Sequence, residues 1–387
     1  MSGPPRPAAD GAPPRATPAE RERLLADFVR LCEIESPSRR ERGVADAIAC
    51  ELRALGLEVS EDASAAETGS DSGNLLAQLS GIDPDAPTVL LCAHMDTVPL
   101  AAPVEVVRED GVLHNRHEAI LGADNKVAVA VLLAVARRLG REPARPGVEL
   151  LFTTCEEQAL AGAKALDRSG LRASYGFVFD HASPVGELIV AAPTYYRVEA
   201  TFRGQAAHAG LRPEAGRSAI VAAAKAVARL PLGRVEESTT ANAGRIEGGT
   251  AANVVPDRCR LQLEARSLDR ERARALVTEI VDALTDAGSD AECDVETVVE
   301  EGFRGYRLAR NTPPVETAVR ALVDLGIAPV PRTTAAGSDA NVLNAVGLPC
   351  LNVADGTEDN HRPDERVSVE SLERVLDVAL GIVAQAR

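Results

Sequence analysis

Helical spacing of apolar residues dominates the first part of the chain. The segment TPAE (17–20) combines an N-cap threonine, a proline in the first turn and a capping-box glutamate, so it predicts the start of a helix. A second helix is predicted over about 44–55, with Gly56 at its end. The same periodicity predicts further helices at about 125–139 and 158–168.

Short apolar runs alternate with these helices and predict buried strands. They lie at 73–79, 88–93, 148–154 and 175–179. Continuous apolar runs that alternate with helices are typical of parallel strands covered on both faces. The sequence therefore predicts an α/β domain with a mostly parallel sheet and helices on both sides.

The pattern changes near residue 192. Apolar and polar residues alternate strictly in TYYRVEATFRG (194–204) and in CRLQLEARS (259–267), which predicts half-buried antiparallel strands. Helices predicted at about 217–229 and 269–286 would cover one face of that sheet. We therefore expect an inserted α+β domain of four strands and two helices.

Strand–helix alternation resumes after this insert and returns the chain to the first domain. A helix is predicted at 312–325, a strand at 349–353 and a final helix from about 368. The predicted division is a Pro/Ala-rich disordered tail at 1–16, the α/β domain at 17–193 and 303–387, and the insert at 194–302.

Composition narrows the classes of partner. A formal net charge of −16 argues against a nucleic-acid partner, because phosphate binding needs a basic surface. No run approaches the roughly 18 apolar residues needed to span a bilayer, and the N-terminus lacks the apolar core of a signal peptide. The seven cysteines are scattered without a C-x-x-C pair, as is typical of reduced thiols. We therefore expect a cytoplasmic protein that binds neither nucleic acid nor membrane.

Histidines and acids gather at the ends of the predicted strands. The carboxyl ends of parallel strands meet at one edge of a sheet, where ligands bind. A single acid after a strand is usually a helix cap or a loop residue, but the joint placement favours one shared site. The residues in question are His94, Asp96, Asp124, Glu156, Glu157, Asp180 and His361.

This set of side chains favours a metal centre. Two imidazoles with three or four carboxylates suit zinc, with cobalt or manganese as substitutes. A single zinc ion would not need so many acids, whereas two ions sharing a bridging carboxylate would. Asp96 lies two residues beyond His94 in an extended segment, so it could accept the other ring N–H of that histidine.

The motifs that carry these residues resemble one family. AHMDTVP, LGADNK, FTTCEE, FVFD, AAHAG, ANVVPD, EARS and GSDAN occur in the order seen in the dinuclear zinc metallopeptidases. That family includes peptidase T, aminoacylase, carnosinase and succinyl-diaminopimelate desuccinylase. The resemblance is closest to the peptidase T-like branch and covers nearly the whole chain after the tail. It implies a zinc-exopeptidase-like α/β sheet with an inserted, ferredoxin-like lid and dimerisation domain.

The resemblance also implies roles for individual residues. His94, Asp124 and Asp180 would surround one zinc ion, and Asp124, Glu157 and His361 would surround the other, with Asp124 as the bridge. Glu156 would be the general base that activates a water molecule. Asp96 would orient His94.

Three residues of the insert are implied as well. His208 matches a histidine that reaches a partner subunit's active site and polarises the scissile carbonyl in related enzymes, which implies a homodimer through the lid. Asn253 resembles a lid residue near the same oxyanion. Arg266 resembles an arginine that grips the free carboxylate of the substrate, although a surface ion pair is its plainer interpretation.

The activity implied by the resemblance is metal-dependent hydrolysis of an amide bond in a small substrate. An aminopeptidase acting on di- and tripeptides with two zinc ions per subunit is favoured. A deacylase of N-acyl amino acids or a carboxypeptidase stays open, because the metal chemistry is shared. A non-catalytic binding or scaffold protein on the same fold is the alternative from another class.

Overall fold

The computed structural model describes residues 14–387, which form two compact units. Unit 1 contains the chain up to Val190 together with Leu308–Thr333 and Ser338–Arg387. Unit 2 contains Ala191–Arg307 and the short segment Thr334–Gly337. That segment joins unit 2 because the Thr334 amide donates to the carbonyl of Ala191, at 3.0 Å, a pairing that the local sequence pattern did not predict.

Unit 1 is built on a sheet with the strand order β1-β2-β6-β3-β7-β16-β8, and β15 also pairs with β8. The four central strands, β6, β3, β7 and β16, are parallel, and β1, β2 and β8 pair antiparallel with their neighbours along this order. The strands are β1 Val59–Glu61, β2 Leu75–Leu79, β3 Val89–His94, β6 Val148–Thr153, β7 Tyr175–Phe179, β8 Glu187–Ala192, β15 Val330–Thr333 and β16 Cys350–Val353. The prediction of a mostly parallel α/β sheet is confirmed.

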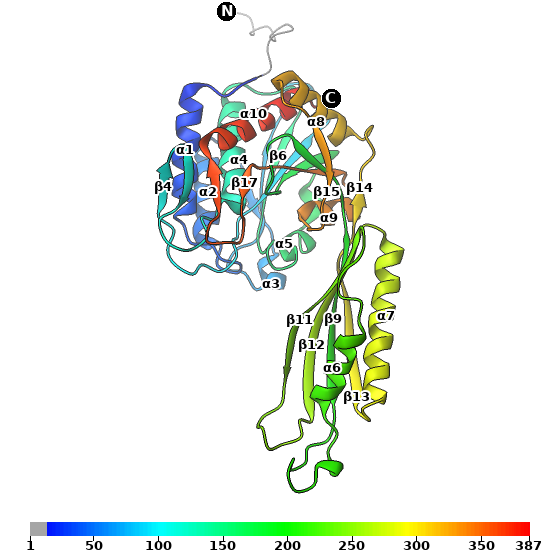
Figure 1. The fold of residues 1–387 in the computed structure, drawn as a ribbon. Helices are drawn as coiled ribbons and strands as arrows, with labels where there is room; N and C mark the ends of the chain where they lie inside the picture. Colours follow the sequence, from blue (N-terminus) through cyan, green and yellow to red (C-terminus); the bar gives the residue numbers. More distant parts are fainter. Residues whose placement is uncertain (1–13) are drawn as a thin grey trace, which may run out of the picture. The chain divides into compact units, whose positions relative to one another are not determined.

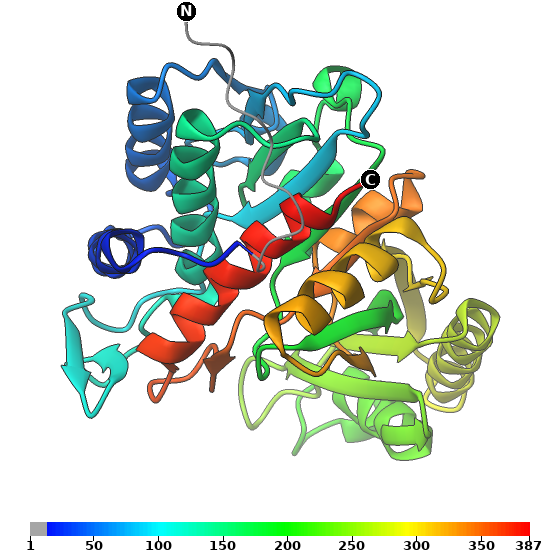
Figure 2. The same ribbon diagram turned by 90° about the horizontal axis from the view of Figure 1, so that it is seen from above.

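Long helices pack on this sheet and on each other. In Figure 2 the red helix α10 lies between the green α4 and the orange α8. The helices of unit 1 are α1 Pro18–Cys32, α2 Arg42–Ala54, α3 Ala65–Thr68, α4 Ala123–Arg141, α5 Ala161–Lys164, α8 Pro313–Leu325, α9 Asp339–Ala345 and α10 Val369–Gln385, with a 3-10 turn at Arg168–Gly170. No helix within residues 14–387 is long and apolar enough to cross a membrane.

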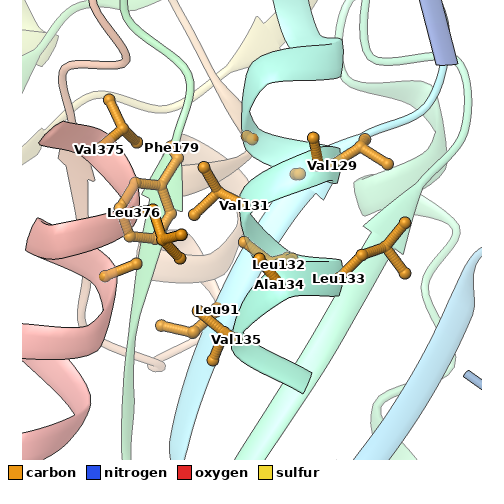
Figure 3. Packing of buried hydrophobic residues seen from close by; sticks show 14 of the residues in the cluster. Leu91, Val129, Val131, Leu132, Leu133, Ala134, Val135, Phe179, Val375 and Leu376 are labelled. Carbon is orange, nitrogen blue, oxygen red and sulfur yellow. The ribbon is translucent and has the colours of Figure 1, made fainter. Parts of the chain in front are cut away.

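Helix α4 is buried on all sides in its first half. Every residue from Ala123 to Ala136 is buried, and Figure 3 shows Val131 and Val135 among Leu91 of β3 and neighbouring apolar side chains. Full burial of each large aliphatic side chain contributes about 1.5–3 kcal/mol. The start of this helix, which carries Asp124, is therefore firmly held against the sheet.

Two expectations need correction. The predicted helix at 158–168 is reduced to α5, because Ala159 and Leu160 adopt left-handed backbone angles that a continuing helix cannot contain. The predicted disordered tail is residues 1–16, of which residues 1–13 lie outside the part that the structure describes. The last residues of this tail are held in place by hydrogen bonds. Arg15 donates to the carbonyl of Leu325 at 3.0 Å, and the Ala16 amide donates to Asp377 at 2.7 Å.

A small separate sheet in unit 1 has the order β17-β18-β5-β4. Its strands are β4 Val106–Glu109, β5 Val112–Asn115, β17 Thr357–Glu358 and β18 Arg366–Ser368. The antiparallel pair β17 and β18 is joined by a loop that we call the His361 loop, residues 359–365. This sheet gives the loop a firm base at both of its ends.

Unit 2 is a separate antiparallel sheet with the order β10-β11-β12-β9-β13 and two helices on one face. In Figure 1 both helices run along the strands. Its elements are β9 Thr194–Arg203, α6 Ala219–Arg229, β10 Gly233–Glu236, β11 Thr239–Gly248, β12 Arg258–Ser267, α7 Arg270–Ser289, β13 Asp294–Phe303 and β14 Tyr306–Arg307, with a 3-10 turn at Pro213–Ala215. The α+β character is confirmed, but short β10 adds a fifth strand that the sequence pattern did not reveal.

Candidate metal centre

The parallel strands place the predicted ligands at one edge of the sheet. His94 is the last residue of β3 and lies opposite Thr153, the last residue of β6. Asp180 directly follows β7, the other neighbour of β3. Residues that lie far apart along the chain are brought together because these three strands run in the same direction.

One side of Asp124 faces His94. The His94 Nε2 atom lies 3.1 Å from Asp124 Oδ1 and 3.6 Å from Asp180 Oδ1. The His94 ring is almost fully buried, so these two acids meet it away from bulk water. The three side chains form the first cluster that the sequence predicted.

The other side of Asp124 faces His361. The His361 Nε2 atom lies 3.1 Å from Asp124 Oδ2 and 2.8 Å from Glu157 Oε1. His361 adopts a left-handed backbone angle, φ 64°, at the tip of the His361 loop. The two oxygens of Asp124 thus face different histidines, which is the geometry a bridging carboxylate requires.

Both members of the glutamate pair lie close to His94. Ligand atoms of His94, Glu156 and Asp180 lie within 4.8 Å of one another, and so do those of His94, Asp124 and Glu157. Only Glu157 of the two glutamates also contacts His361 among the described ion pairs. That contact distinguishes Glu157 as the carboxylate of the second cluster, beside His361.

Asp96 holds the paired glutamates as well as His94. The His94 Nδ1 atom lies 3.0 Å from the Asp96 carbonyl oxygen and 3.4 Å from its carboxylate. The carboxylate accepts hydrogen bonds from the backbone amides of Glu156 at 2.9 Å and Glu157 at 3.2 Å, and from the Ser38 hydroxyl at 2.7 Å. Asp96 therefore fixes the turn that presents both acids, a task the sequence did not reveal.

The electrostatics of the cluster favour a bound dication. Burial, and then the nearby Asp180 carboxylate, raise the pKa of Glu156 well above its ordinary value. Burial raises the pKa of Asp180 to about 7. Hydrogen bonds to Asp124 and Glu157 raise the pKa of His361 to about 10. The acids outnumber the cationic groups beside them, and metal ions in the cluster would neutralise the excess, so the residues present fit such ions.

Three predicted residues lie in unit 2. His208 Nδ1 accepts hydrogen bonds from the amides of Gly210 and Leu211, both at 3.2 Å, which leaves Nε2–H of the neutral ring as a donor. The Ala209 amide donates to the Asn253 carbonyl at 3.0 Å, so the two predicted oxyanion residues are neighbours. Both side chains are exposed.

Arg266, also in unit 2, is held by several contacts. Its guanidinium lies 4.8 Å from the centre of the Tyr195 ring, 3.1 Å from the Glu264 carboxylate, and 2.9 Å from the Ala335 carbonyl that it donates to. Its Nε–H is buried and has no hydrogen-bond partner among the described residues. The ion pair that the plainer interpretation expects is present.

The sequence analysis missed residues that hold the ligands. Asn360 donates to Asp124 Oδ2 at 2.9 Å, and the Glu365 carboxylate accepts from the Asp124 amide, also at 2.9 Å. Asp339, in the motif GSDAN, is buried and accepts a hydrogen bond from Thr153 at 2.5 Å. The cluster of polar residues around His361, in DNHRPDE, is the signal that could have pointed to the first two.

The chain is similar to known proteins over almost their whole length. The aminopeptidase PepT from Bacillus cereus is 36% identical, with 95% of this chain and 98% of that chain covered and a TM-score of 0.86. A tripeptidase from Staphylococcus aureus is 33% identical, with 94% and 98% covered and a TM-score of 0.89. Protein YqjE from Bacillus subtilis is 38% identical over 366 residues, or 94% of this chain and 98% of that protein.

Two family models match parts of the chain. Residues 74–200 match Peptidase family M28, and residues 194–292 match the Peptidase dimerisation domain. The fold and the clustered ligands thus define a metal-dependent peptidase that carries a dimerisation domain. Within that class, the chain belongs to the peptidase T-like family. The resemblance found in the motifs is confirmed, and the alternative of a non-catalytic scaffold is not supported.

Proposed function

We propose that the chain is an aminopeptidase that removes the first residue from short peptides, chiefly tripeptides. The observation that carries the proposal is Asp124, whose two carboxylate oxygens face His94 and His361 separately. The aminopeptidase and tripeptidase among the similar structures support the substrate class. Histidine and carboxylate ligands favour two zinc ions per subunit, with cobalt or manganese as substitutes.

The metal ions are held by five side chains in this proposal. His94 and Asp180 would hold one ion, Glu157 and His361 would hold the other, and Asp124 would contribute to both. When bound, the ions polarise the scissile carbonyl and lower the pKa of a water molecule. Asp96 keeps the ligand His94 and the turn of Glu156 in place through the contacts described above.

Glu156 is the group that transfers a proton from the water molecule to the leaving amine. It is buried beside His94 and Asp180, and its raised pKa suits a group that takes a proton from water and then gives it to the leaving amine. His208 Nε2–H and Asn253 supply hydrogen bonds to the oxyanion. Arg266 binds the free carboxylate of the peptide, because a guanidinium matches that group with two parallel hydrogen bonds.

A substrate panel tests this function. With zinc- or cobalt-loaded protein, we expect a free tripeptide to be cleaved at its first bond. Its N-acetyl analogue and its C-terminal amide should each react at least about tenfold more slowly, because each lacks a charged group worth about 1.5–3 kcal/mol in a hydrogen bond. Product analysis by mass spectrometry and values of kcat/KM measure both effects.

The panel also separates the enzyme alternatives. Faster reaction of N-acyl amino acids than of free tripeptides would replace the aminopeptidase by a deacylase. Release of the last residue instead of the first would replace it by a carboxypeptidase. A C-terminal amide that reacts as fast as the free acid would remove Arg266 from its proposed role.

We further propose a homodimer formed through unit 2, in which His208 serves the active site of the partner subunit. The match of residues 194–292 to a dimerisation domain supports this assembly. We expect a mass of two chains in light scattering, and about 10²–10³-fold lower kcat for His208→Ala, the usual cost of losing one oxyanion donor. Mixing His208→Ala with Glu156→Gln chains should restore activity in mixed dimers. A fully active monomer would contradict the dimer.

A further inference from the structure

The carboxylate of Glu365 lies at the end of the His361 loop and has no role in the scheme above. Its residue is only 1% exposed, although glutamate is rarely buried without partners. It directly precedes β18, and His361 lies four residues before it. A buried acid in this position needs a structural explanation.

Three backbone amides explain the burial of Glu365. The amides of Leu121 and Gly122 both donate to Oε2 at 2.8 Å, and the amide of Asp124 donates to Oε1 at 2.9 Å. Gly122 adopts a left-handed backbone angle, φ 75°, immediately before α4. The Glu365 carboxylate therefore fixes the turn from which Asp124 projects.

The same loop also holds the side chain of Asp124. Asn360 donates to Asp124 Oδ2 at 2.9 Å, and His361 Nε2 lies 3.1 Å from that oxygen. The Glu365 amide donates to the Arg362 carbonyl at 3.0 Å, which closes the loop on itself. The His361 loop thus contacts both the backbone amide and the carboxylate of Asp124, and it also supplies the neighbouring ligand His361.

We propose that Glu365 is a positioning residue that sets Asp124 as the bridge between the two metal ions and couples its orientation to that of His361. The inference rests on the proposed dinuclear site and goes beyond it by assigning a residue that is not a ligand. Hydrogen bonds to a charged acceptor are strong, and a buried amide that loses its acceptor is costly. Loss of such an outer partner typically lowers metal affinity by about 10–100-fold.

Glu365→Gln is the first test. Glutamine keeps the size but offers one acceptor oxygen, so its amide NH₂ must face at least one backbone N–H. We expect the weaker of the two metal sites to lose about 10–100-fold in affinity, measured by titrating the metal-free protein with cobalt and following the visible absorption bands. The band positions should also change, because the bridging ligand moves relative to the ions.

Glu149→Gln is the matched control. Glu149 is also 1% exposed, and its carboxylate accepts from the backbone amides of Arg172 at 2.9 and 3.1 Å and of Ala173 at 3.0 Å. It lies near the start of β6, at the opposite end of the strand from Glu156. Thermal unfolding of the metal-free forms should show a comparable loss of stability, as a lower midpoint temperature, for both variants. Cobalt affinity should fall only in Glu365→Gln.

The outcomes are distinct. The positioning role would be overturned if Glu365→Gln had the cobalt affinity and spectra of the wild type. An equal loss of cobalt affinity in Glu149→Gln would overturn it as well. Wild-type protein that binds fewer than two ions would overturn the dinuclear site itself. If Glu365→Gln does not fold, Glu365→Asp serves instead: it keeps the charge but shortens the reach, and unchanged affinity for both ions in that variant would also overturn the role.

Discussion

Replacing Glu156 by glutamine is expected to lower kcat for a tripeptide by about 10²–10⁴-fold while two metal ions stay bound. Glutamine keeps the shape of the buried side chain but cannot take the proton of a water molecule. The metal ligands assigned above do not include Glu156, and Asp96 holds its backbone whatever the side chain, so the centre should stay intact. Steady-state kinetics and metal analysis of the same preparation measure the two effects together.

The neighbouring residue provides the matched comparison. Glu157→Gln should lose one of the two ions, because Glu157 is the carboxylate that lies 2.8 Å from His361. Excess zinc should restore part of the activity of Glu157→Gln and none of that of Glu156→Gln. Equal metal content and equal residual activity in the two variants would show that the roles are not divided as proposed.

Part of the ligand set could be predicted from sequence because it depends on strand direction, whereas Asp124, at the start of α4, and His361, in a loop of the small antiparallel sheet, do not follow from it. Parallel strands bring their carboxyl ends to one edge, so an acid or histidine placed after each apolar run must lie near the others. His94 and Asp180 are examples: each stands at the end of a strand that can be read from its apolar residues, and the structure places them 3.6 Å apart. The two-residue period of β9 and β12 similarly revealed the antiparallel unit.

The contacts that hold the ligands could not all be found in this way. Asp96 could be predicted beside His94, but its bonds to the amides of Glu156 and Glu157, like those that Glu365 accepts, leave no pattern in the sequence of the residues that donate them. Helix α5 is shorter than predicted for a similar reason. The left-handed residues Ala159 and Leu160 have side chains that ordinarily favour helices, so tertiary contacts override their local preference.

The pair Glu156 and Glu157 shows how the fold places like charges side by side. Cys155, just before them, has a left-handed backbone angle, φ 50°, and its amide donates to the buried Glu41 carboxylate at 3.0 Å. Asp96 accepts from the next two amides. Successive backbone groups are therefore fixed by acids, and the remaining repulsion between the side chains favours the arrival of cations.

Metal binding is expected to release protons, so that affinity rises with pH. In the metal-free chain the pKa of His361 is about 10, and its ring is protonated between pH 6 and 8. A metal ligand must be deprotonated, so the ion displaces that proton throughout this range. The apparent association constant of the ion held by His361 should therefore increase by about tenfold per pH unit. For the other ion, held by His94 and Asp180, the dependence should steepen below about pH 7, because Asp180, whose pKa is about 7, then carries a proton.

Calorimetric titration with zinc in two buffers of different ionisation enthalpy counts the released protons directly. At pH 7 we expect at least one proton per chain for the wild type. His361→Asn should release about one proton fewer and bind one ion more weakly. His117→Asn is the control, because that exposed histidine pairs with Glu105 at 3.7 Å and contacts none of the ligands among the described ion pairs. Zinc binding without proton release, or an affinity that does not change between pH 6 and 8, would mean that His361 does not give up a proton to the ion. The ligands of the second ion would then have to be reassigned.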